Sequence, residues 1–305
     1  MAESLQQTTV PQLATPHAER RTRPRWQQNL FALLYDPVTL ISLIVLTAVI
    51  VMAVAAPVLT PHDPELQSLR LRTRPPFWLM NNEPGYPLGT DALGRDILSR
   101  IIFGARVSML VGIGAVIIQG TIGVLVGLMA GFFGGWIDTV LMRLADIQQA
   151  IPFLILAVAV AAVVDQSLLN VIIVLGVAGW VPYGRVVRAE VLSVREREFV
   201  TAARALGSSN LRLIFTHILP NVAASITVIS TLTISTMILA EASLSFLGLG
   251  VPPSTPTWGG MVAAGRDYLA TAAWVSIIPG IAIFLTVLSI NLLGDKLRAL
   301  LDPTL

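Results

Sequence analysis

Long apolar segments, separated by shorter polar ones, constrain this chain more than any other feature. The run from Val38 to Leu59 is long enough to span a bilayer, since a helix needs about 20 residues to cross the hydrocarbon core. Of the 305 residues, 54% are hydrophobic and 12% are charged, whereas soluble proteins have about 25% charged residues. The sequence therefore predicts an all-α membrane protein.

The apolar segments predict about six transmembrane helices. Arginines gather beside these segments, most densely between Arg185 and Arg212, and such basic density marks the cytoplasmic side of a membrane. An even number of spans then places both termini in the cytoplasm. A cleaved signal peptide is the alternative for the first run, but its polar lead is too long. The expected spans are 38–59, 107–132, 139–164, 168–187, 220–249 and 273–293.

A polar, helix-forming segment separates the fourth and fifth spans. It has the sequence EFVTAARALGSSNLRLIFTHILPN at residues 198–221. Its first half is rich in strong helix formers, and Gly207 is a typical helix stop. The residues that follow, Ser208, Ser209 and Asn210, are of the types that cap a new helix. We expect a short helix, a turn and a second short helix on the cytoplasmic side.

The spacing within this loop resembles the "EAA" loop of permease subunits in ATP-binding-cassette (ABC) importers. In that family the loop sits in a cleft of the ATPase subunit, so the resemblance implies that its small residues allow close helix approach. The Glu of the family motif is replaced here by Thr201, and its Ile by His217. An amphipathic connector that touches only lipid headgroups is the alternative. The residues that the resemblance assigns to ATPase coupling are Glu198, Thr201, Ala202, Ala203, Leu206, Gly207, His217 and Pro220.

Three further segments resemble the same family. They are GTDALGRDILSR at 89–100, AEASLSFLGLG at 240–250 and NLLGDKLRALLDP at 291–303. Together with the loop they look like the second, or "C", type of permease in dipeptide, oligopeptide, glutathione or nickel importers. The resemblance implies a type I importer permease fold and alternating access. It favours a peptide as the substrate, with glutathione or nickel as alternatives.

The resemblance also implies the domain organisation and the partners. A second homologous permease, two ABC ATPase subunits and an extracytoplasmic substrate-binding protein are expected in a bacterial inner membrane. ATP and Mg would bind to the ATPase subunits, and no cofactor is expected on this chain. The expected parts are a cytoplasmic tail at 1–37, the first helix at 38–59, an extracytoplasmic loop at 60–105, a permease domain at 106–296 that contains the coupling loop 196–220, and a cytoplasmic tail at 297–305.

Several residues within or beside the spans are candidates for a specific role. Gly123, Gly127 and Gly131 recur every fourth residue, which predicts close packing against a neighbouring helix. Glu241 and Ser243 are candidates for a water-filled translocation path, and pairing of Glu241 with Arg106 is the equally weighted alternative.

Other ionisable residues are expected to have structural roles. The cluster Asp91, Arg95, Asp96 and Arg100 is expected to pair internally as a cap at the outer face. A mutual ion pair or snorkelling is expected for Arg143 and Asp146. Pro152 should bend the third span, because it removes a backbone hydrogen bond.

The remaining composition excludes other classes of function. There is no cysteine, and the three histidines, His17, His62 and His217, lie in separate segments, so no metal cluster is expected. A GxxxxGK[ST] phosphate loop is absent, so this chain does not hydrolyse ATP itself. An aspartyl intramembrane protease would need a mate for Asp295. An ion-coupled secondary transporter is the stronger alternative, but it leaves the coupling loop unexplained. The arginines form no long basic stripe, so nucleic acid is not an expected partner.

Overall fold

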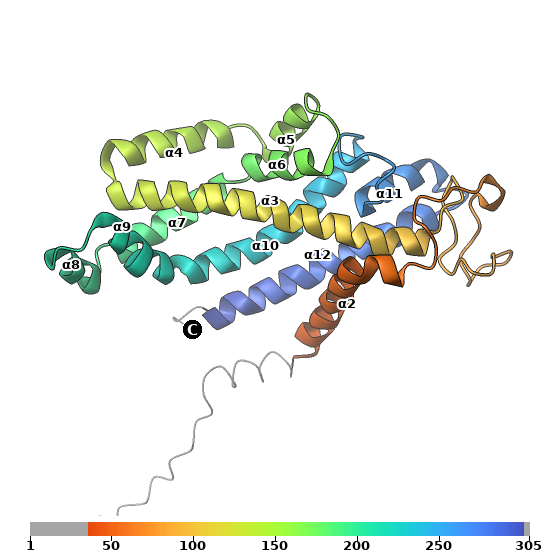
Figure 1. Ribbon diagram of the computed structural model, residues 1–305, viewed down its shortest axis with the longest axis horizontal. Coiled ribbons are helices and arrows are strands. Elements are labelled where there is room, and N and C mark those ends of the chain that lie inside the picture. The colour runs from red at the N-terminus through yellow and green to blue at the C-terminus, as the bar shows by residue number, and fades with distance from the viewer. Residues whose placement is uncertain (1–35, 302–305) are drawn as a thin grey trace, which may run out of the picture.

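The computed structural model describes residues 36–301, and in that part the chain is a bundle of helices without a β-strand. Of the expected tails at 1–37 and 297–305, residues 1–35 and 302–305 lie outside the described residues, whereas 297–301 belong to the helix that begins at Trp274. Figure 1 shows α3 running along the middle of the bundle, with α8 and α9 at one end and α11 at the other. The helices are α2 (Pro37–Leu59), α3 (Ile97–Phe133), α4 (Gly135–Gln149), α5 (Phe153–Ala161), α6 (Leu168–Ala178), α7 (Val181–Val194), α8 (Glu198–Ala205), α9 (Asn210–Arg212), α10 (Leu219–Phe246), α11 (Trp258–Gly265) and α12 (Trp274–Leu301).

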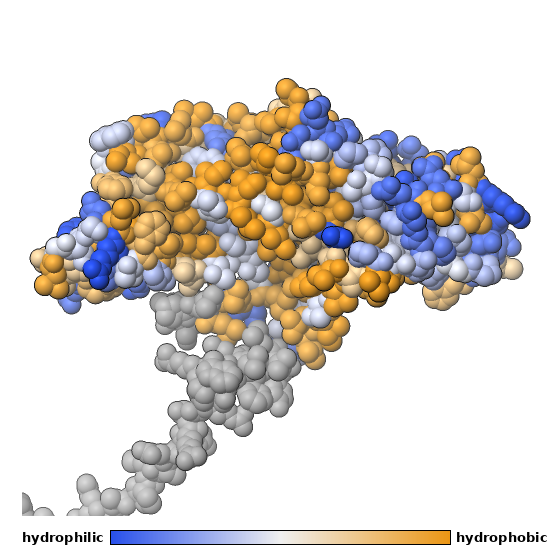
Figure 2. All heavy atoms as spheres, in the orientation of Figure 1, coloured by the Kyte–Doolittle hydropathy of each residue, from blue (hydrophilic) through white to orange (hydrophobic). Residues whose placement is uncertain are grey.

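Four of these helical segments are long and apolar enough to cross a membrane. They are α2, α3, the continuous stretch Asn210–Phe246, and α12. Two pairs of shorter helices, α4 with α5 and α6 with α7, meet the same criterion together, so the described part has up to six spans. Figure 2 shows the expected surface, with apolar side chains over the middle of the bundle and polar ones gathered toward its two ends.

The second span begins at Ile97, earlier than the expected start near 107 and inside the segment expected to be a loop. The reason is the side chain of Asp96, which accepts hydrogen bonds from the backbone nitrogens of Leu98 and Ser99 and so caps the helix. The last four residues of GTDALGRDILSR thus form the first turn of α3, while the first eight lie ahead of the helix.

The third and fourth spans are each broken in two. The axes of α4 and α5 differ by 79° at a break that contains Pro152, so this proline does more than bend one helix. The axes of α6 and α7 differ by 42°, and Pro182 lies in the first turn of α7, where its missing N–H costs nothing. Backbone irregularity at this depth is tolerated where protein buries it or where it lines a cavity.

The three glycines of α3 lie against α7. An added Cβ at Gly123 would come within 2.3 Å of the Tyr183 Cβ, and at Gly127 within 2.7 Å of the Val187 Cβ. At Gly131 the nearest atom would be the Val191 Cβ, 2.8 Å away. Any larger side chain on this face would therefore force α3 and α7 apart.

Three buried apolar clusters follow the long axis of the bundle. One is centred on α3, α6 and α10, a second joins α2, α11 and α12 to the first half of α3, and a third joins the end of α3 to α7 and the start of α10. Since α3 contributes to all three, it connects the two ends of the molecule. At the start of α2, Asp36 caps the helix and pairs with Lys296 of α12 at 3.2 Å.

Candidate functional site: the coupling loop and a central cavity

The coupling loop, residues 196–220, forms the first short helix and the turn that the sequence predicts. Helix α8 ends at Ala205, and Gly207 then adopts φ +83°, the left-handed conformation that favours glycine. The backbone nitrogen of Ser208 closes the turn on the Ala203 oxygen at 3.1 Å. Ser209 caps the next helix by accepting a hydrogen bond from the Arg212 nitrogen.

The second short helix is not separate, which corrects the expected helix–turn–helix. Helix α9 continues through a π-helical turn, η2 (Leu213–Ile218), into α10 without a break. Pro220 therefore lies in the first turn of α10, as expected, but on a helix that has already started at Asn210. The return half of the loop is thus one rigid body with the fifth span.

The inner face of the loop is anchored to the ends of α3 and α7. Val200, Leu213 and Ile218 are fully buried, and they pack in one cluster with Phe132 of α3 and Val191 of α7. The guanidinium of Arg195 donates a 2.7 Å hydrogen bond to the Gly131 oxygen, which closes the junction between α7 and α3. A force applied to α8 would therefore reach α3 and α7 directly.

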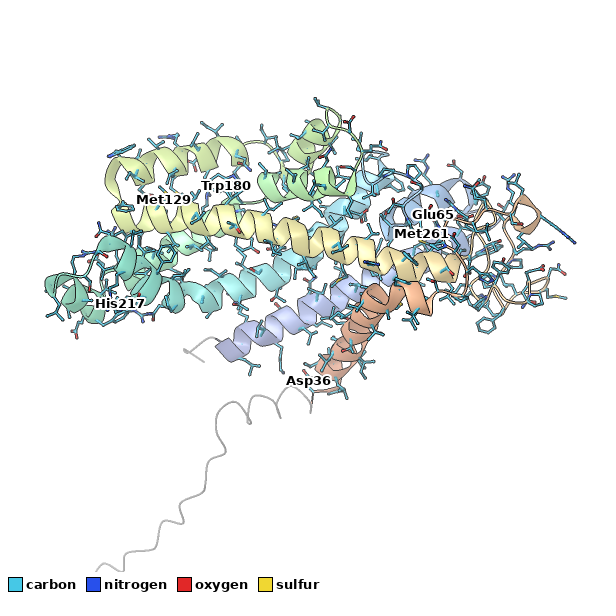
Figure 3. All side chains as sticks on the ribbon, in the orientation of Figure 1. Asp36, Glu65, Met129, Trp180, His217 and Met261 are labelled. Carbon is cyan, nitrogen blue, oxygen red and sulfur yellow. The ribbon has the colours of Figure 1, made fainter. Side chains whose placement is uncertain are left out.

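Three large apolar side chains are exposed on the outer face of the loop. Leu206 is 88% exposed, Leu211 69% and Phe215 55%. They lie at the tip of the molecule, beyond the glycine stripe, and the side chain of His217 lies at this same end (Figure 3). Because Gly207 has no atom within 4 Å of an added Cβ, its surroundings are open. The loop thus exposes small and apolar groups beside charged ones such as Arg204 and Arg212.

The motif residues of α8 and η2 take up defined positions. Thr201, which replaces the motif Glu, is exposed, and its hydroxyl donates only a long 3.4 Å bond to the Arg197 oxygen. Glu198 is exposed at the start of α8, and Ala202 lies on the same exposed surface. The ring of His217 lies 6.4 Å from that of Phe199, which ties the two halves of the loop together.

Two ion pairs hold α4 against α7 near the same end. Arg188 donates to both carboxylate oxygens of Asp138, the Nη2–Oδ2 distance being 2.6 Å. Arg185 pairs with Asp146 at 2.7 Å. The expected pair of Arg143 with Asp146 is therefore wrong, because α7 brings a second arginine closer to Asp146 than its neighbour on α4.

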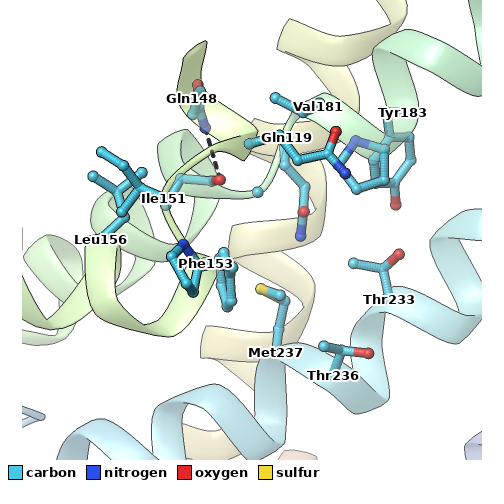
Figure 4. A pocket seen from close by; sticks show the side chains of 15 residues that line it. Gln119, Gln148, Ile151, Phe153, Leu156, Val181, Tyr183, Thr233, Thr236 and Met237 are labelled. Carbon is cyan, nitrogen blue, oxygen red and sulfur yellow. Dashed lines mark hydrogen bonds between the residues drawn. The ribbon is translucent and has the colours of Figure 1, made fainter. Parts of the chain in front are cut away.

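A cavity of about 460 Å³ lies in the middle of the bundle, where the two broken spans meet α3 and α10. We call it the central cavity. Ile151 and Pro152 contribute the break between α4 and α5, and Gly179 contributes the break between α6 and α7. Its lining residues are Gln119, Gln148, Gln149, Ile151, Pro152, Phe153, Leu156, Ala178, Gly179, Val181, Pro182, Tyr183, Thr233, Thr236 and Met237 (Figure 4).

Most polar side chains around the central cavity have partners. Gln148 donates to the Ala178 oxygen at 2.8 Å and accepts from the Trp180 indole nitrogen at 2.6 Å, and so satisfies the interrupted end of α6. The Tyr183 hydroxyl lies 3.1 Å from the Ser230 hydroxyl. Thr233 donates to the Ile229 oxygen one turn earlier. The cavity wall contains no charged side chain.

The predicted path residues lie elsewhere. Glu241 is fully buried between α3 and α10, where it accepts a 2.7 Å hydrogen bond from Ser245 and lies 3.5 Å from the Ser108 hydroxyl. It does not pair with Arg106, because positions 106 and 108 of a helix point in different directions. Glu241 does not line the central cavity, and its place in a translocation path stays a prediction. Ser243 is half-buried and bonds to the Leu239 oxygen of its own helix.

The outer motif folds as an internal cap. Asp91 pairs with Arg95 at 2.7 Å and lies 3.7 Å from the Nε of Arg100, and both arginines are buried. Asp96 accepts from the Ser99 hydroxyl at 2.6 Å and contacts His62 at 3.2 Å. As expected, this cluster pairs with itself, although Asp96 is used by the helix start rather than by an arginine.

The central cavity and the glutamines that line it were not predicted from the sequence. The signal was present, since Gln119, Gln148 and Gln149 are uncharged polar residues within or beside apolar spans, two of them just before Pro152. The sequence alone could not show that these glutamines lie beside Gly179 and Pro182. That placement depends on both helix breaks lying beside α3, where they line one cavity.

The fold is that of an ABC importer permease. A solved structure of the MetNI methionine ABC transporter in an inward-facing conformation has a chain that matches with a TM-score of 0.54 and 20% sequence identity, over 67% of this chain and 97% of that one. Since identity is low, this match establishes the fold alone. The chain is therefore an all-α membrane protein of the type I importer permease class.

The chain belongs to the family described as the binding-protein-dependent transport system inner membrane component, whose profile matches residues 123–305. The profile of the N-terminal TM domain of oligopeptide transport permease C matches residues 25–76.

Curated relatives include the di/tripeptide transport system permease protein of Pseudomonas aeruginosa. It is 45% identical, over 86% of this chain and 87% of the relative. The glutathione transport system permease protein of Pectobacterium atrosepticum is 42% identical, over 72% of each. This chain is thus a permease subunit of an ABC importer, as the loop spacing predicts.

Proposed function

We propose that this subunit translocates di- or oligopeptides across the bacterial inner membrane, driven by separate ATPase subunits. The observation that carries the proposal is the coupling loop, whose apolar tip is exposed while its inner face is anchored to α3 and α7. The peptide assignment is supported by the relatives named for di/tripeptide and glutathione transport. Nickel is disfavoured, because within the described residues no group of three His, Cys, Asp or Glu could hold a metal ion.

In this proposal the chain works within a larger assembly. A second homologous permease completes the transmembrane unit, two ABC ATPase subunits bind ATP and Mg on the cytoplasmic side, and an extracytoplasmic protein delivers substrate. Both termini are then cytoplasmic. Closure of the ATPase pair moves α8, and the packing of Gly131 and Arg195 carries that displacement into α3 and α7. The two broken spans are where this movement would open the bundle alternately to each side.

The test is co-purification of the ATPase subunits with the tagged, detergent-solubilised chain from its native membrane. We expect Ala202→Asp with Gly207→Asp to abolish co-purification, because both positions are exposed on the loop. Asp267→Asn at the opposite end is the control and should retain the ATPase subunits. Equal recovery from the double variant and the parent would refute the coupling surface.

The substrate is tested separately. Uptake of a labelled tripeptide, trialanine, by cells that express the whole system should depend on this chain, and excess glutathione should compete only if the pathway is shared. If cells that lack this chain lose nickel uptake but still take up trialanine, the peptide assignment is refuted.

A further inference from the structure

We propose that the central cavity is a peptide-binding site and that the Gln119 amide donates a hydrogen bond there to a backbone carbonyl of the translocated peptide. The inference rests on the proposed function and deepens it, because it assigns the path to a place other than Glu241. It is carried by the cavity, by the two helix breaks that line it and by an unsatisfied donor in its wall.

The unsatisfied donor is the side-chain amide nitrogen of Gln119. Gln119 is 1% exposed, and its Nε2 is the one buried side-chain nitrogen or oxygen in residues 36–301 that has no hydrogen-bond partner. A buried amide without a partner is costly, and such groups are rare in native structures. The side chain lines the central cavity, so a ligand that enters the cavity can supply the missing acceptor (Figure 4).

A glycine at the break between α6 and α7 leaves space for the Gln119 side chain. The break between α6 and α7 has glycine at position 179, and a Cβ added there would lie 2.3 Å from the Gln119 Oε1. Any larger residue at Gly179 would displace the amide. The break therefore leaves room for the Gln119 amide, whose oxygen lies over Gly179 and whose Nε2 has no hydrogen-bond partner.

Several other polar groups in the cavity wall are already hydrogen-bonded within the protein. Gln148 uses both ends of its amide on Ala178 and Trp180, and Tyr183 pairs with Ser230. The Thr236 hydroxyl makes only a 3.5 Å contact to the Leu232 oxygen. Within the described residues the wall thus offers the Gln119 donor, the exposed amide of Gln149 and the adaptable Thr236 hydroxyl, none of them committed to a strong bond.

The chemistry of the wall selects the class of ligand. The cavity has no charged lining residue, so it would not discriminate between acidic and basic side chains. Its volume, about 460 Å³, falls within the roughly 300–1,000 Å³ of small-molecule sites. What peptides of different sequence share is the neutral backbone amide, and an amide donor beside apolar groups recognises that group. A free metal cation would find no ligand here.

The test uses the absence of cysteine from the sequence. Thr236→Cys places a single thiol in the cavity wall, and Leu239→Cys places one on the same helix at an exposed position outside the lining. The complete complex, without ATP, is treated with a water-soluble maleimide at increasing trialanine concentration. Modification of the tagged chain is followed by mass.

We expect trialanine to protect Thr236→Cys and not Leu239→Cys. Free alanine, which has no peptide bond, should not protect at the same concentration. Adding Gln119→Leu should raise the trialanine concentration for half-protection about threefold to tenfold, the range that corresponds to one neutral hydrogen bond. Gln119→Met, which is unbranched and also lacks the donor, should give the same shift and guards against a packing effect of leucine.

The inference is overturned if Gln119→Leu and Gln119→Met leave protection unchanged, if alanine protects as well as trialanine, or if Thr236→Cys is never protected although cells take up trialanine. In each of these results the proposed function survives. If the parent system takes up no trialanine at all, the peptide assignment itself fails, and the inference fails with it. Co-purification of the ATPase subunits verifies assembly of every variant.

Discussion

The two ends of this molecule treat their polar and apolar groups in opposite ways. At the outer end, Asp91 neutralises two buried arginines and Asp96 caps α3, so the most conspicuous polar motif of the sequence is used up internally. At the coupling end, Leu206 and Leu211 stay exposed on a loop whose other face is anchored. The difference indicates that a dense polar motif can be purely structural, while a loop with exposed apolar side chains is the surface that we propose for partner contact.

This comparison predicts that substitutions at the outer end change stability and those at the coupling end change transport. The largest loss of stability is expected for Asp91→Asn. It leaves Arg95 and Arg100 buried without their carboxylate, and loss of one partner from a buried pair costs about 3–5 kcal/mol. Thermal unfolding of the detergent-solubilised complex measures the effect. Asp267→Asn, in an exposed pair at the same end, should change the midpoint little. Equal midpoints for the two variants would break the comparison.

Gly127→Leu should have the next largest effect, because α3 joins the two ends. Its side chain would overlap the Gly184 oxygen and the Val187 Cβ, and overpacking of this kind costs about 1–3 kcal/mol. We expect a lower unfolding midpoint and weaker uptake together. Gly280→Leu on α12 is the matched control, since no atom lies within 4 Å of an added Cβ there. A silent Gly127→Leu would show that the glycine stripe does not set the distance between α3 and α7.

Gly207→Leu separates backbone strain from partner contact. The left-handed conformation costs a non-glycine residue about 1–2 kcal/mol, and Gly248, at the far end of α10, has φ +77° and an equally open Cβ position. Both leucine variants should therefore lose similar stability. Peptide uptake per ATP hydrolysed should fall only in Gly207→Leu. A matching loss of uptake in Gly248→Leu would mean that strain, rather than docking, explains the effect.

The smallest effect is expected at Asp36, where α2 begins. The hydrogen bond from Thr39 and the pairing with Lys296 lower the pKa of the Asp36 carboxyl. A carboxylate whose pKa is lowered on folding stabilises the folded state above its unfolded pKa, and that contribution disappears as the pH falls through the folded value. Asp36→Asn should thus lower the unfolding midpoint slightly at pH 7, and this deficit should shrink as the pH falls below the usual aspartate pKa of about 3.9. A deficit that persists in acid would contradict this assignment.

The sequence predicted much of the fold because its signals are local. The apolar run that ends at Leu59 is one helix, and the arrest of α8 at Gly207 follows from a glycine that adopts positive φ. The self-pairing of Asp91 with Arg95 also follows from a four-residue spacing on one segment. Each of these features depends on residues that are close together in the chain.

The predictions that the structure corrected depend instead on how different helices pack together. Glu241 meets Ser108 across two helices, and Asp146 meets Arg185 of α7 rather than its neighbour on α4. Fusion of the return half of the loop with the fifth span arises through η2, which packs Leu213 under α7. None of these partners can be found from spacing, because each depends on how far one helix is rotated against another.

By itself, then, the sequence determined that the chain is a membrane-spanning helical protein, where its helices approximately lie and which loop resembles a coupling element. These follow from hydropathy and local backbone preference. Only the tertiary structure decided that the breaks between α4 and α5 and between α6 and α7 line one cavity and that Gln119 lies in its wall. The physical reason is that a cavity is defined by what several distant segments fail to fill, and no single segment carries that information.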